Sequence, residues 1–203
     1  MNKRILILAM TVFTLVVMTL PMIPTAQACR CRRPTEVYDD LFVWGGTVPD
    51  GPADVWPLWG NKQCGRYTAH SSFVQILWDR NPDLPTPPKY NGILEGEGEY
   101  IVCYTINRDT GKGIATLKTK VTIDDDVYGA GTFEGYILWV GDLILNPDNT
   151  VRLPNLMMGE MGSWAWYTYW RGTLAYAGWT ITQNFDETWN TPGGNYEGYL
   201  TIR

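Results

Sequence analysis

The chain has 203 residues and carries 16 basic side chains against 21 acidic ones, which gives a net charge of −5. An acidic chain without a basic stripe disfavours nucleic acid and anionic membranes as partners. The single histidine, His70, excludes a metal site built from several histidines.

Residues 1–28 have the three parts of a secretory signal. The segment begins with a basic pair, Lys3 and Arg4, and continues with an apolar run over residues 5–20 that only three threonines interrupt. It ends in Ala-Gln-Ala, a small-x-small cleavage site, at residues 26–28. We therefore predict a secreted or cell-surface protein from which this segment is removed.

Two alternatives to cleavage stay open at the start of the chain. One is a retained membrane anchor, although the apolar run is short for a span of about 20 residues. The other is a lipoprotein attached at Cys29, although Ala26 stands where an attachment box usually has leucine. Cleavage leaves residues 29–203, with 14 basic and 21 acidic side chains and no predicted membrane span.

All four cysteines lie in the mature part of the chain: Cys29, Cys31, Cys64 and Cys103. An even number of cysteines in an exported chain predicts two disulfides. Cys29 and Cys31 are too close to pair easily with each other, so we expect them to pair with Cys64 and Cys103 in an order left open. A zinc site from the same thiols is the alternative, although C-x-C lacks the two-residue gap of a zinc knuckle.

Residues 29–91 are rich in turn-forming residues and hold most of the prolines. One apolar run, Ser71–Trp78, predicts a strand. We expect the rest to be loop that packs on the following domain, braced by the disulfides and by three tryptophans, Trp44, Trp56 and Trp59.

Residues 92–203 show the period-two alternation of half-buried strands. From Leu94 to Ile106, one face is mostly apolar, whereas Glu95, Glu97 and Glu99 lie on the other. Further strands are predicted, with short turns between them, at residues 114–123, 132–145, 163–181 and 195–203. No segment has a helical period with caps, so we predict an all-β domain over residues 92–203: an antiparallel β-barrel or a barrel-like sandwich.

A short phrase, glycine–x–large apolar–glutamate–glycine, occurs three times, at Gly92–Gly96, Gly131–Gly135 and Gly194–Gly198. In a strand, the large residue and the closing glycine share one face, and the glutamate lies on the other. Glycine suits a place where a strand coils sharply or where a side chain lies over bare backbone. We interpret the phrase as a barrel device with the large residue inside and the glutamate in water; chance repetition is the alternative.

These three phrases resemble strand openings in the small antiparallel barrels of the allene oxide cyclase and dirigent type, and more loosely in lipocalin-like barrels. The resemblance covers residues 92–203 and implies a barrel fold. It implies no activity, and no catalytic residue of those families maps onto this chain.

The sequence predicts no nucleophilic or metal-dependent catalytic site. His70 is followed by Ser71, but there is no G-x-S-x-G elbow. The three aspartates at residues 124–126 and the Asn-Pro-Asp-Asn segment at residues 146–149 offer oxygen ligands for calcium, but they are interpreted as turns because neither has a complete calcium loop. We expect no metal and no cofactor.

Carboxylates are the remaining candidates for catalysis. Glu95, Glu97 and Glu99 share one strand face, which fits a solvated surface that resists edge pairing. A polar barrel interior would reverse this assignment and place the glutamates in the lumen, where paired carboxylates can hydrolyse glycosides.

The ten tryptophans and twelve tyrosines are the strongest compositional signal. Residues 163–171 place aromatic side chains on both faces of one strand, so something must cover the second face. The N-terminal region, a ligand and a second copy of the chain are the three candidates. We predict an aromatic ligand-binding platform formed by Trp139, Trp164, Trp166, Tyr167, Tyr169, Trp170 and Trp179.

These observations favour a secreted, disulfide-braced β-barrel with a non-enzymatic binding role. Carbohydrate or an apolar small molecule is the expected ligand. The alternatives are a self-associating structural or cell-surface protein, which would form a homo-oligomer, and a barrel enzyme that works through carboxylates.

Overall fold

The computed structural model describes residues 35–85, 88–154, 160, 162–188 and 195–203. These residues form strands and turns without any helix, so none of them provides a helix that could cross a membrane. The predicted signal at residues 1–28 lies outside the described residues. The all-β class is confirmed.

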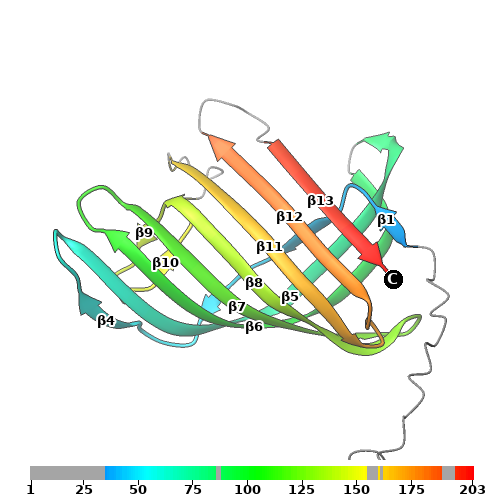
Figure 1. The fold of residues 1–203 in the computed structure, drawn as a ribbon, viewed down its shortest axis with the longest axis horizontal. Helices are drawn as coiled ribbons and strands as arrows, with labels where there is room; N and C mark the ends of the chain where they lie inside the picture. The colour runs from blue at the N-terminus through cyan, green and yellow to red at the C-terminus, as the bar shows by residue number, and fades with distance from the viewer. Residues whose placement is uncertain (1–34, 86–87, 155–159, 161, 189–194) are drawn as a thin grey trace, which may run out of the picture. The chain divides into compact units, whose positions relative to one another are not determined.

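The strands form one large antiparallel sheet that curls into a half-barrel (Figure 1). Its order is β1-β13-β12-β11-β8-β7-β6-β5-β2, while β3 and β4 also pair with β5, and β9 and β10 form a separate hairpin. The bounds are β1 Glu36–Tyr38, β2 Phe42–Gly45, β3 Val48–Pro49, β4 Asp54–Pro57, β5 Lys62–Pro85, β6 Pro88–Asn107, β7 Lys112–Asp125, β8 Gly129–Asp142, β9 Ile144–Leu145, β10 Val151–Arg152, β11 Ser163–Leu174, β12 Trp179–Thr188 and β13 Asn195–Ile202.

The two ends of the sheet, β1 and β2, are consecutive in the chain. β1 pairs with β13, and after a short turn β2 pairs with β5. In that turn Asp40 has a φ of 54°, a left-handed conformation that aspartate adopts more readily than most residues. Leu41 donates its N–H to the carbonyl of Gly198 at 3.2 Å. Residues Glu36–Gly45, which we call the bridge segment, therefore connect the two edges of the half-barrel.

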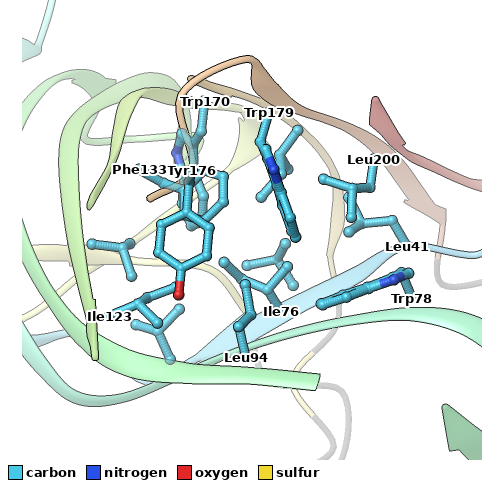
Figure 2. Packing of buried hydrophobic residues seen from close by; sticks show 14 residues of the cluster. Leu41, Ile76, Trp78, Leu94, Ile123, Phe133, Trp170, Tyr176, Trp179 and Leu200 are labelled. Atoms are coloured by element: carbon cyan, nitrogen blue, oxygen red, sulfur yellow. The ribbon is translucent and has the colours of Figure 1, made fainter. Parts of the chain in front are cut away.

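The concave face of the sheet holds two apolar clusters. The first lies under the bridge segment, where Leu41 is buried among side chains of β5, β6 and β13 (Figure 2). Its members are Leu41, Val43, Val74, Ile76, Trp78, Leu94, Val121, Ile123, Phe133, Trp170, Tyr176, Trp179, Ile181 and Leu200. The second is formed by Tyr67, Ala69, Tyr100, Val102, Tyr104, Ile106, Ala115, Leu117, Trp139, Leu143 and Val151.

The side chains of the repeated phrase that the structure describes lie on the faces of the sheet that the sequence predicted. Leu94 and Phe133, the large residues of the first two copies, are fully buried on the concave face. The glutamates of all three copies, together with Glu97 and Glu99, are exposed. The interpretation that places these glutamates in a lumen is therefore wrong, because a one-residue shift of parity would be needed to turn them inward.

Two closing glycines of the phrase lie where neighbouring strands approach closely. A β-carbon on Gly135 would lie 1.9 Å from the carbonyl oxygen of Tyr169 on β11, and one on Gly96 would lie 2.2 Å from the carbonyl oxygen of Thr122 on β7. Both contacts are far inside van der Waals distance. Glycine at these positions allows the strands to coil against each other, which is how the sheet becomes concave.

The sheet begins earlier than the predicted boundary at residue 92. β5 starts at Lys62 and pairs with β6 along most of its length, so the predicted strand at Ser71–Trp78 is only part of it. Its inward positions near the start are Gly65, Tyr67 and Ala69, which give a weak apolar alternation and conceal the strand in the sequence.

The three tryptophans of the N-terminal region differ in their contacts. Trp59, in the turn between β4 and β5, is 96% exposed and does not anchor the region as predicted. Trp44 and Trp56 are about half exposed, and Trp44 donates its indole N–H to the Gln75 side chain at 2.6 Å and makes an edge contact with Phe73 at 5.5 Å. Paired strands and the burial of Leu41 also attach this region to the sheet.

The predicted disulfides are not formed among the described residues. Cys64 and Cys103 are both free thiols, on the adjacent strands β5 and β6. Cys64 lies opposite Thr105 and Cys103 lies opposite Arg66, so the two cysteines are diagonal neighbours. Diagonal Cα atoms are about 7–8 Å apart, beyond the usual reach of a disulfide. Cys29 and Cys31 lie outside the described residues.

We predict that Gly135→Ala lowers the free energy of unfolding by about 1–3 kcal/mol, because the new methyl group collides with backbone that cannot rotate away. Gly46→Ala is the matched control: its β-carbon meets nothing within 4 Å, so stability should stay the same or rise slightly. Urea denaturation of both variants measures the difference, and equal stabilities would show that the close approach at Gly135 is not a constraint.

We predict that Leu41→Ala lowers the free energy of unfolding by about 2–5 kcal/mol, the usual cost of a cavity at a fully buried leucine. Leu58→Ala, at an exposed leucine outside the core, should change it by no more than about 0.5 kcal/mol. Thermal and urea denaturation provide the measurement. A small effect at Leu41 would mean that the bridge segment is not held by its buried side chain.

Candidate functional site

A cavity of about 150 Å³ lies on the concave face and is lined by members of both apolar clusters. The bridge segment forms one wall, and strands β5 to β8, β11 and β12 form the others. Its lining residues are Val43, Trp44, Gly45, Thr47, Val74, Tyr100, Leu117, Ile137, Trp139, Trp166, Thr168, Trp170 and Gln183.

The seven residues predicted as one aromatic platform are divided between the two faces of the sheet. Trp139, Trp166 and Trp170 line the cavity. Tyr167 and Tyr169 lie on the opposite, convex face and are exposed. The strand alternation that placed aromatic residues on both sides of β11 is therefore real, and only its inward half belongs to the cavity.

The remaining two tryptophans pack beside the cavity. Trp164, Trp166 and Phe185 of β12 form a cluster of three rings, with centroids 5.2 Å apart for Trp164 and Phe185, 5.0 Å for Trp166 and Phe185, and 5.6 Å for the two tryptophans. Trp179 makes an edge contact with Trp78 at 5.9 Å within the first cluster. These contacts fix the aromatic walls, because neighbouring rings restrict one another's rotation.

Four buried nitrogen atoms of the described side chains have no hydrogen-bond partner, and all four belong to donor groups. They are the indole nitrogens of Trp164, Trp166 and Trp170 and the amide nitrogen of Gln183. Gln183 and Trp170 are each only 1% exposed. Buried donors without partners are rare and costly in folded proteins, so this group of donors requires an explanation.

The polar residues of the cavity were not identified from the sequence. Gln183 follows Trp179 and Ile181 at alternating positions of β12, and Thr168 lies between Trp166 and Trp170 on β11. The same parity that predicts the aromatic residues to face inward applies to these two polar residues. A polar residue at an inward-facing strand position was therefore the sequence signal that could have identified these two cavity residues. Counts of residue types do not reveal it.

Burial changes the protonation of two tyrosines on the concave face. Burial alone raises the pKa of Tyr100, which lines the cavity, to about 12. Burial also raises the pKa of Tyr67 to about 12, although the hydrogen bond that its hydroxyl donates to the Val151 carbonyl acts in the opposite direction. Both hydroxyls therefore stay protonated, and able to donate hydrogen bonds, throughout the physiological pH range.

The other chemical groups singled out in the sequence lie away from this cavity. His70 Nδ1 lies in hydrogen-bond contact with Asp50 Oδ1 at 2.5 Å on the convex side, and this hydrogen bond lowers the pKa of the Asp50 carboxyl. No cluster of three or more potential metal ligands occurs within the described ranges. The cavity itself is lined by no acidic or basic side chain.

We predict that the free energy of unfolding falls as the pH rises from about 10 to 12, and that Tyr100→Phe makes this fall shallower. A tyrosine in the unfolded chain loses its proton near the ordinary tyrosine pKa of 10.0, whereas buried Tyr100 keeps it to about 12. The unfolded state therefore binds fewer protons in this window, and stability decreases with pH. Urea denaturation at several pH values measures both slopes. Identical slopes in the two proteins would contradict the raised pKa of Tyr100.

Comparison of the chain with protein-family models, with curated protein sequences and with solved structures found no match. The resemblance to allene oxide cyclase and dirigent barrels therefore remains a prediction, and the cavity must be interpreted from its own chemistry.

Proposed function

We propose that the protein is a non-enzymatic binding protein that holds one small, largely apolar molecule in the cavity of the concave face. The ligand carries a hydrogen-bond acceptor such as a carbonyl or ether oxygen. Export through the predicted signal at residues 1–28 is part of this proposal.

The size and lining of the cavity limit the class of ligand. A cavity of about 150 Å³ accepts a molecule of roughly the size of benzene. Three tryptophans, Tyr100 and several aliphatic side chains form its walls, which favours a flat ring over a flexible chain. Carboxylates are absent from this lining, which supports binding rather than acid–base hydrolysis.

The single observation that carries the proposal is the unpaired amide nitrogen of Gln183 in the lining of this cavity. Leaving such a donor without a partner costs about 1–3 kcal/mol. Leucine at this position would fill a similar volume without that cost. A ligand oxygen that accepts a hydrogen bond would offset the cost, and the indole N–H groups of Trp166 and Trp170 provide further donors in the same lining.

Two probes of similar shape test the proposal: acetophenone, which carries a carbonyl oxygen, and cumene, which carries no acceptor. We predict that acetophenone binds and shifts the indole N–H resonances of Trp166 and Trp170 in proton–nitrogen correlation spectra. Cumene should bind at least several-fold more weakly, because it leaves the buried donors unpaired. Trp59, which is exposed outside the core, provides an internal reference resonance that should not move.

Gln183→Leu should weaken acetophenone binding by roughly tenfold, the equivalent of one hydrogen bond, and should leave cumene binding unchanged or stronger. Gln63→Leu is the matched control, because Gln63 is also buried but its amide already donates to the Tyr104 hydroxyl at 2.9 Å, outside the cavity lining. Equal binding of the two probes, or no movement of the Trp166 and Trp170 resonances, would refute the proposal.

A further inference from the structure

The convex face of the sheet carries a second and larger hollow, with a volume of about 830 Å³. It lies over strands β5 to β8 and is separate from the cavity on the concave face. The outward side chains that line it are those of Asp50, Thr68, His70, Glu99, Ile101, Lys118, Lys120, Glu134 and Tyr136. The hollow therefore combines charged side chains with the apolar surface of an isoleucine and of one exposed ring.

The charged residues form a row of alternating sign across the strands. Register places Glu99 opposite Lys120, Lys120 opposite Glu134, and Glu134 opposite Arg171 of β11. His70 precedes Glu99 in the same row and forms a hydrogen bond with Asp50. Within the described chain, no ion pair shorter than 4 Å joins the other members of this row. Arg171 donates to the Tyr169 hydroxyl, and one oxygen of Glu134 accepts from Thr132 at 3.5 Å. The carboxylate of Glu99, the amine of Lys120 and the second oxygen of Glu134 are available to a ligand.

Tyrosines form a second row beside the charged row, two residues further along the strands. Tyr136 of β8 lies opposite Tyr169 of β11, and Tyr199 of β13 follows after one intervening strand. Tyr136 is 54% exposed and Tyr169 is 43% exposed. Arg171 donates a hydrogen bond to the Tyr169 hydroxyl at 2.7 Å and lies 5.4 Å from that ring's centre, so this ring is held in place.

The combination of rings with charges of both signs identifies the class of ligand. An anion or a cation would require a row of one sign, whereas Glu99, Lys120 and Glu134 alternate. A second copy of the chain would require an interface core depleted of lysine and glutamate, which is the opposite of this hollow. A sugar has apolar ring faces that stack on tyrosine and hydroxyl groups that both donate and accept hydrogen bonds.

We propose that the convex face is a binding site for an uncharged oligosaccharide. The glycan chain lies across the strands along Tyr136 and Tyr169, and its hydroxyl groups bind Glu99, Lys120 and Glu134. This site is independent of the interior ligand, because it uses the opposite face of β8 and β11.

Isothermal titration with cellohexaose, xylohexaose, mannohexaose and chitohexaose tests this site. We expect at least one of these neutral probes to bind, and Tyr136→Ala and Tyr169→Ala each to weaken that binding by roughly tenfold. Tyr136→Phe, which keeps the ring face, should retain most of the affinity. Trp59→Ala is the control for non-specific stacking on an exposed ring and should not change the oligosaccharide affinity. A thermal melt of each variant shows whether it is folded.

Three outcomes would overturn the inference. The first is that none of the four probes binds, and the second is that binding is restricted to a sulfated glycan such as heparin, which would require an anion site. The third is a dimer in light scattering that Tyr136→Ala dissociates, which would show that the face is an interface between copies.

Discussion

The bridge segment is the constraint on which the rest of the structure depends. A curled sheet with free edges would leave its concave face open to water and would expose unpaired strand edges to other chains. Residues Glu36–Gly45 connect β13 to β5, and the buried Leu41 attaches this connection to the first cluster. Because Val43, Trp44 and Gly45 also form a wall of the cavity, the same ten residues complete both the fold and the interior site.

The coil of the sheet is produced by close strand contacts at glycine. At Gly96 and Gly135 the neighbouring backbone occupies the space that a side chain would need. The strands thereby bend around large inward residues such as Phe133, while the adjacent glutamates stay in water. One repeated phrase thus accounts for both the curvature and the separation into a dry face and a wet face.

The sequence predicted well on which face of the sheet each side chain lies. Period-two alternation over residues 92–203 predicts which side chains lie on each face, because that information is local. The start of β5 at Lys62 was concealed, because its inward positions carry Gly65 and Ala69 rather than large apolar residues. Trp139, Trp166 and Trp170 of the cavity lining were among the predicted aromatic residues, but the bridge segment and the polar residue Gln183 were not predicted, since the cavity depends on contacts between residues far apart in the chain. The free Cys64 and Cys103 show the same limit: an even number of cysteines in an exported chain predicted that both would pair with Cys29 and Cys31, but cysteine count carries no information about which thiols meet in the fold.

Stability explains the residues of the two proposed sites to different degrees. Tyrosine is favoured in strands, and the cross-strand pair of Tyr136 and Tyr169 is compatible with folding alone. A sequence that optimised folding only would place an aliphatic residue at Gln183. Gln183 instead introduces an unpaired donor into a dry interior, and this cost is the reason for proposing that a ligand with an acceptor oxygen occupies the cavity.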